Sequence, residues 1–236
     1  VIGFLWLSIC LYIIFGGADF GAGIVEFFTR KSNRTKTKNL MYESIAPVWE
    51  ANHMWLIIAI VILFVGFPEI YTTLSIYLHI PLVLMLLGII ARGTAFTFRH
   101  YDAVKDDWQG VYTQIFYYSS LLTPFFLGLI AAATISHSIN PEATHFLDLY
   151  IFSWLNWFGV AVGCFTVSIC AYLASVFALR ETSDRLELNL MIKKSKQTMV
   201  FVVITGILVF LTAYLSDIPL LVWVFSKPIG IIASVS

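Results

Sequence analysis

The chain has 236 residues and no net charge, and 59% of its residues are hydrophobic whereas only 12% are charged. Soluble domains carry about 25% charged residues, so this composition, with a mean hydropathy of +0.87, excludes an ordinary soluble core and predicts an all-α polytopic transmembrane protein. The neutral net charge and the lack of a basic stripe argue against nucleic acid as a partner.

Long apolar runs recur along the chain and are separated by polar stretches. A run of about 20 apolar residues is the length that an α-helix needs to cross a bilayer. We expect a first four-helix bundle in residues 1–136 and the start of a second, truncated helical half in 137–236, with about seven helices visible in all. The individual helices are predicted at 1–28, 46–67, 70–98, 111–136, 147–179 and 198–216, and a seventh run starts at Leu220.

The basic residues are unevenly distributed between the predicted loops. All of the 14 Lys and Arg residues except Arg92 and Lys227 follow the first, third or fifth predicted helix, whereas the intervening loops contain none. Basic loops of membrane proteins remain in the cytoplasm, so this pattern predicts a multi-pass protein whose amino terminus lies outside.

The first predicted helix carries an acid within a run of small residues, Gly-Gly-Ala-Asp-Phe-Gly-Ala-Gly at 16–23. Gly17 and Gly21 are four residues apart and form a smooth face for close helix contact. Asp19 lies in the middle of this face. One interpretation is a packing seam with an incidental acid, but an acid in a helix contact is expected to be buried and either paired or functional.

The second predicted helix opens with Ala-Pro-Val-Trp-Glu-Ala-Asn-His-Met-Trp-Leu-Ile at 46–57. Glu50 and His53 are three residues apart and share one helix face, so that together they could transfer a proton. The alternative is that Glu50 is an acid at a helix start, where the helix dipole stabilises it, and that His53 is structural. On the first of these two interpretations, the carboxylate of Glu50 is a candidate proton carrier.

The third predicted helix ends with Arg-Gly-Thr-Ala-Phe-Thr-Phe-Arg at 92–99. Arg92 lies deep enough to need an anionic partner, and we expect it to share one polar pocket with Asp19 and Glu50. Arg99 is predicted to be an interfacial anchor. The five histidines and three cysteines have no spacing typical of haem or metal ligands, so no metal site is predicted.

These three segments, in this order and at this spacing, resemble subunit II of the cytochrome bd-type quinol oxidases. The resemblance extends over the whole chain, with the helices in the same order, and its specific motifs lie in the first 100 residues. It implies a haem-free subunit of the bacterial inner membrane, in a heterodimer with subunit I to which small single-helix subunits can be added. Subunit I is then expected to hold haem b and haem d, oxidise quinol in the respiratory chain and reduce oxygen to water.

The resemblance also assigns roles to residues. It implies that Glu50 belongs to a cytoplasmic proton pathway, that Trp49 and Asn52 flank it, and that Asp19 lies nearby with Arg92 in the supporting pocket. Many members of the family have Asp where this chain has Glu50, a change that preserves the acid chemistry.

Two other functions remain open from the sequence. A proton-coupled secondary transporter could use Asp19 and Glu50, but it would favour an inverted repeat, and no counterpart of these motifs follows residue 100. A structural scaffold could instead use the same acids only for buried ion pairs.

Overall fold

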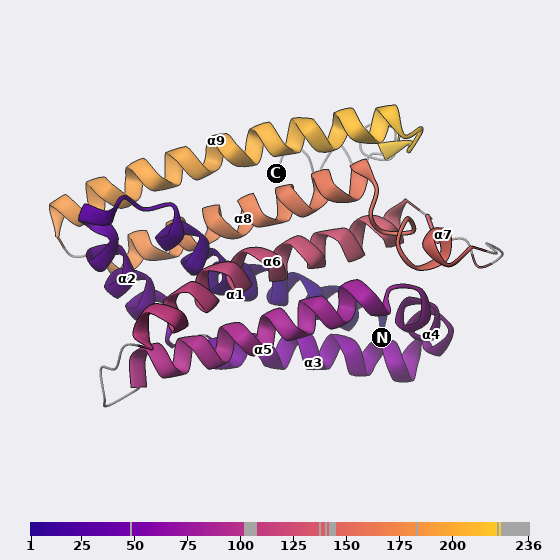
Figure 1. Cartoon of the computed structure of the whole chain (residues 1–236), viewed down its shortest axis with the longest axis horizontal. Helices are drawn as coiled ribbons and strands as arrows, with labels where there is room; N and C mark the ends of the chain where they lie inside the picture. Colours follow the sequence, from indigo (N-terminus) through magenta and orange to yellow (C-terminus); the bar gives the residue numbers. More distant parts are fainter. Residues whose placement is uncertain are drawn as a thin grey trace.

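The computed structural model describes residues 1–47, 49–101, 108–136, 138–139, 141, 145–182, 184–220 and 222, apart from the side chains of Glu50, His100 and Tyr101. Within these residues the regular structure is entirely helical, as predicted, and the long helices lie side by side along the molecule (Figure 1). The helices are α1 (Ile2–Phe27), α2 (Lys31–Ile45), α3 (Trp49–Gly66), α4 (Pro68–Tyr77), α5 (His79–Tyr101), α6 (Gln109–Ile135), α7 (Phe146–Tyr150), α8 (Trp157–Glu181) and α9 (Arg185–Leu215).

Five of the described helices, α1, α5, α6, α8 and α9, are long and apolar enough to cross a membrane. The pair α3 and α4 passes the same test together but is bent by 114° at its break. The predicted helices at 1–28, 46–67 and 111–136 thus correspond closely to α1, α3 and α6. The predicted seventh run lies almost entirely outside the described residues.

Two predicted helices are each divided in the structure. The predicted helix at 70–98 comprises α4 and α5, which are separated at Leu78. Pro81 lies in the first turn of α5, where its missing N–H group is tolerated, but it would remove a hydrogen bond from one continuous helix. The predicted helix at 147–179 comprises α7 and α8, and Asn156 caps the start of α8 by accepting a hydrogen bond from the backbone N–H of Gly159 at 2.6 Å.

Two polar stretches that were predicted as loops are helical. The basic segment after α1 forms α2, and α9 begins at Arg185 although the prediction started it at 198. Both stretches bury a few apolar side chains, among them Leu40 and Met41 of α2 and Met191 of α9, in one cluster. Because both stretches also carry many exposed charges, neither is uniformly apolar as a membrane span is, and the amphipathic pattern is weak in the sequence.

Helix α1 contacts four other helices, α2, α3, α6 and α8. The glycines of its small-residue run make these contacts close. A Cβ atom on Gly21 would lie 1.8 Å from the carbonyl oxygen of Cys170 in α8, and one on Gly23 would lie 2.2 Å from Ser120 Oγ in α6. The run is therefore a packing seam, and it brings the segment around Asp19 against several helices at once.

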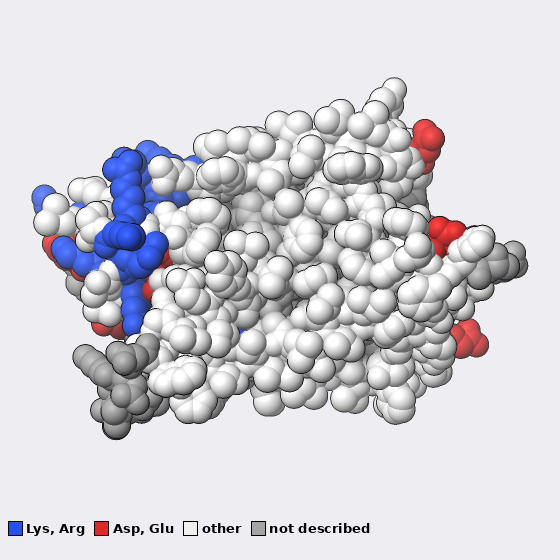
Figure 2. Space-filling model, viewed as in Figure 1, with Lys and Arg blue, Asp and Glu red and all other residues white. Residues whose placement is uncertain are grey.

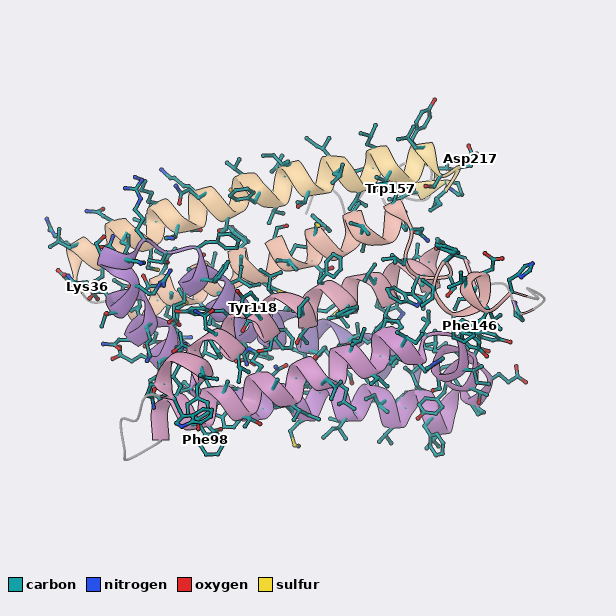
Figure 3. The ribbon with its side chains drawn as sticks, in the orientation of Figure 1. Lys36, Phe98, Tyr118, Phe146, Trp157 and Asp217 are labelled. Carbon is teal, nitrogen blue, oxygen red and sulfur yellow. The ribbon has the colours of Figure 1, made fainter. Side chains whose placement is uncertain are left out.

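Charged side chains gather at the two ends of the molecule (Figure 2). Lys and Arg residues cover one end, over α2 and the start of α9, and we call this the basic end. The described acids at the opposite end are Glu69, Asp148 and Asp217. Figure 3 shows Lys36 and Asp217 at these two extremes, with mostly apolar side chains along the surface between them. This arrangement suits a protein whose middle lies in lipid.

Candidate functional site

Three of the residues that the sequence singled out, Asp19, Arg92 and Asn52, are buried at the junction of α1, α3, α5 and α6. Arg92 of α5 and Asp19 of α1 form an ion pair in which Arg92 Nη1 donates to Asp19 Oδ2 at 2.6 Å. Arg92 Nη2 donates to the backbone carbonyl of Asp19, and Nε donates to Ser120 Oγ at 3.1 Å. Asp19 is 0% exposed and Arg92 2%. The predicted contact between this acid and this base is present, and all of it is shielded from solvent.

A second ion pair lies nearer the basic end. Arg99 Nη2 donates to Glu26 Oε2 at 2.8 Å, Arg99 Nη1 donates to Oε1 at 3.3 Å, and the hydroxyl of Tyr117 donates to Oε1 at 2.7 Å. The prediction that Arg99 is an interfacial anchor is wrong, because this side chain is buried. Its partner, Glu26, was not identified from the sequence.

The two pairs have the same spacing on both helices. Asp19 and Glu26 are seven residues apart on α1, and Arg92 and Arg99 are seven residues apart on α5. Seven residues are close to two helical turns and span roughly 10 Å, so parallel helices present both pairs on one face. This matched spacing of two acids and two bases is the signal that could have identified Glu26.

An aromatic ring separates the two pairs. The centroid of the Phe116 ring, on α6, lies 5.0 Å from the guanidinium carbon of Arg92 and 4.3 Å from that of Arg99. The centroid of the Phe20 ring, on α1, lies 5.4 Å from the guanidinium carbon of Arg92. These distances allow cation–π attraction, which supports two arginines in an environment that excludes water.

Helix α3 contributes a buried amide to the same junction. Asn52 is 0% exposed, and a Cβ atom on Gly16 would lie 2.7 Å from Asn52 Oδ1, so the missing side chain of this glycine makes room for the amide. Within the described residues, Asp19 Oδ1, Tyr12 Oη and both polar atoms of Asn52 are buried without a hydrogen-bond partner. Buried polar atoms usually have a partner, so this group is suited to bind water or a proton.

The remaining predicted residues lie at the start of α3. Glu50 is in the first turn of this helix, but its side chain lies outside the described part of the structure, so its predicted contact with Asp19 and Arg92 stays a prediction. Trp49 packs against Phe96 of α5, with ring centroids 5.5 Å apart, and against His53 at 6.3 Å. Trp49 therefore belongs to the aromatic contact between α3 and α5.

The chemistry available in this junction is that of carboxylates, guanidinium groups, hydroxyls and an amide. Such groups can bind and transfer protons or order water. In the described ranges, no group of three or more His, Cys, Asp and Glu side chains is arranged to hold a metal ion.

Comparison with known proteins gives a consistent result. The family model for cytochrome bd terminal oxidase subunit II matches residues 1–235. Among curated relatives, a cytochrome bd ubiquinol oxidase subunit 2 from Bacillus subtilis (strain 168) is 28% identical over 221 residues, which cover 90% of this chain and 63% of that protein. A cytochrome bd-I ubiquinol oxidase subunit 2 from Escherichia coli (strain K12) is 24% identical over 198 residues, which cover 80% of this chain and 51% of that protein.

The fold has a match among solved structures. A chain in the structure of bd oxidase from Geobacillus thermodenitrificans aligns with a TM-score of 0.72 and 18% identity, covering 90% of this chain and 65% of the other. The present chain spans about half to two thirds of the length of these relatives.

Proposed function

Because the chain belongs to the cytochrome bd terminal oxidase subunit II family, we propose that it is the haem-free subunit of a membrane quinol:oxygen oxidoreductase. In this proposal a partner subunit carries haem b and haem d, oxidises quinol and reduces oxygen to water. The two relatives are ubiquinol oxidase subunits, which supports this class of activity. The present chain then supports the partner and provides a proton pathway from the cytoplasm, in a bacterial inner membrane.

The observation that carries the proposal is the buried junction at Asp19. Reduction of oxygen consumes protons, and electrons that enter a low-dielectric site need compensating positive charge. By the positive-inside rule the basic end faces the cytoplasm and the amino terminus lies outside. Glu50, in the first turn of α3, is then near the cytoplasmic surface, whereas Asp19 of α1 is fully buried.

The contacts of Asp19 favour a role in proton transfer. Arg92 binds one carboxylate oxygen, Oδ2, whereas Oδ1 makes no hydrogen bond of standard geometry in the described residues, although the amide of Asn52 lies close enough to act on the same carboxylate. Ser120 fixes the guanidinium through Nε. A carboxylate that is anchored at one oxygen can accept a proton at the other without losing its position. Asn52 offers an amide beside the same helix contact and could order a bridging water.

The proposal is tested by replacing Glu50 in the assembled oxidase. Glu50→Gln keeps the side-chain volume but removes the transferable proton, so we expect quinol-driven oxygen consumption to fall by about tenfold or more, within the range that general acid–base groups contribute. Glu50→Asp keeps the acid and is expected to have a mild effect. The haem absorption spectrum of each variant is the control, because loss of haem would report failed assembly.

The scaffold hypothesis is the second candidate, since the two described acids of α1 are both in ion pairs. Normal turnover in a fully assembled Glu50→Gln enzyme would remove Glu50 from the proton pathway and favour this scaffold role. The transporter hypothesis gains no support from the family match.

A further inference from the structure

A groove at the basic end has two chemically different parts. It has a volume of about 920 Å³ and lies between the end of α1, the middle of α8 and the first half of α9. This volume falls within the roughly 300–1,000 Å³ that is usual for small-molecule sites. The groove is separate from the junction around Asp19, and none of the roles proposed above uses it.

The part of the groove farther from the basic end, which we call the deep part, is apolar. Its walls include Val167 and Ala171 of α8 and Phe201 of α9. The hydroxyl groups of Ser168 and Thr205 also line it, but they lie 2.8 Å from one another, and each is within hydrogen-bond distance of a backbone carbonyl of its own helix. The deep part therefore presents a surface that suits a hydrocarbon chain.

The outer part of the groove is cationic. Lys193, Lys194 and Lys196 of α9 line it together with the amides of Asn189 and Gln197. Lys194 Nζ donates to the backbone carbonyl of Phe28 at 3.2 Å, which ties α9 to the end of α1. Lys193 and Lys196 are exposed and are available to an anionic group.

The length of the groove matches one leaflet of a bilayer. Lys193 and Thr205 are both lining residues and are separated by about 18 Å along α9, at 1.5 Å per residue. Half of a hydrocarbon core of about 30 Å is about 15 Å. A molecule in the groove would thus have its charged end at the headgroup level and its apolar end near the middle of the membrane.

We propose that this groove binds an anionic phospholipid, with the headgroup phosphate at Lys193 and Lys196 and one acyl chain between α1, α8 and α9. Charge complementarity favours this occupant over a neutral lipid or a neutral quinol, which would gain nothing from the lysines. The apolar walls explain why the tail is held in a defined place.

The test uses the complete oxidase complex, purified in detergent and equilibrated with mixed micelles that contain equal amounts of phosphatidylglycerol and phosphatidylcholine. Lipid retained after gel filtration is quantified by mass spectrometry. We expect the unmodified complex to retain more phosphatidylglycerol than phosphatidylcholine. The double variant Lys193→Gln/Lys196→Gln should lower the retained ratio of phosphatidylglycerol to phosphatidylcholine by about tenfold, since each lysine near an anionic lipid contributes to its binding.

Two further variants make the result specific to the groove. Lys31→Gln/Lys36→Gln removes two exposed lysines of α2 at the same end and should leave the lipid ratio within about twofold, since it changes net charge equally but lies outside the groove. Thr205→Phe fills the apolar part without changing charge and should lower the total retained phosphatidylglycerol. An unchanged ratio in Lys193→Gln/Lys196→Gln, an equal fall in the α2 control, or retention of quinone or a protein segment in the groove would each overturn the proposal.

Discussion

The two buried ion pairs between α1 and α5 have the same chemistry but different surroundings. In the outer pair both oxygens of Glu26 are engaged, one by Arg99 and Tyr117 and the other by Arg99. In the inner pair only Oδ2 of the Asp19 carboxylate accepts from Arg92. The other donors of Arg92 bind Ser120 Oγ and the backbone carbonyl of Asp19. The carboxylate is thus fully hydrogen-bonded in the outer pair and only partly in the inner pair, and for this reason we propose proton transfer at the inner pair and a supporting role for the outer pair.

The largest effect is expected from Arg92→Met. This change removes the guanidinium that binds Asp19 and leaves a buried carboxylate without its counter-charge, which should cost roughly 3–5 kcal/mol of stability. The measurement is the thermal unfolding midpoint and the yield of the assembled complex. Arg185→Met, at an exposed position, is the control and should have little effect. If Arg92→Met had the same thermal unfolding midpoint as the unmodified complex, the inner pair would not stabilise the fold.

Glu26→Gln should cost about 2–3 kcal/mol of stability, because the amide keeps hydrogen-bonding capacity but leaves the charge of Arg99 unpaired. The oxygen-consumption rate per assembled haem should stay within about twofold of normal, since a locked carboxylate carries no proton. The rate is normalised by the haem spectrum to separate stability from turnover. A severe loss of normalised turnover would contradict the supporting role of the outer pair.

Asp19→Asn sharpens the same contrast. Its stability should fall about as much as in Glu26→Gln, but the normalised turnover should fall by about tenfold, because Asn cannot accept the proton that Oδ1 would bind. The measurement is again quinol-driven oxygen consumption. Equal normalised turnover in Asp19→Asn and Glu26→Gln would remove the functional distinction between the two pairs.

The smallest effect is expected from Tyr117→Phe, which removes one hydrogen bond to Glu26 and should cost about 1.5 kcal/mol. Tyr118→Phe is a matched control, because Tyr118 is the next residue on α6 and is 58% exposed. The difference between the two unfolding midpoints measures how far the hydroxyl of Tyr117 stabilises the outer pair. Identical midpoints would mean that Arg99 alone holds Glu26.

Much of this molecule follows from local sequence properties. Hydropathy located α1, α3 and α6, and the placement of Lys and Arg separated the two ends of the molecule. The high cost of a lone buried charge predicted that Asp19 and Arg92 would meet. These properties depend on each segment and its solvent, so they can be evaluated before the helices are packed.

Other features depend on which helices become neighbours. Arg99 has the position of an interfacial anchor when α5 is considered alone, and only the approach of α1 and α6 supplies Glu26, Tyr117 and the Phe116 ring. The helicity of α2 likewise depends on burying Leu40 and Met41 in a cluster shared with α8 and α9. Burial and pairing are properties of contacts between segments that are distant in the sequence, and for this reason only the packing of the helices decides them.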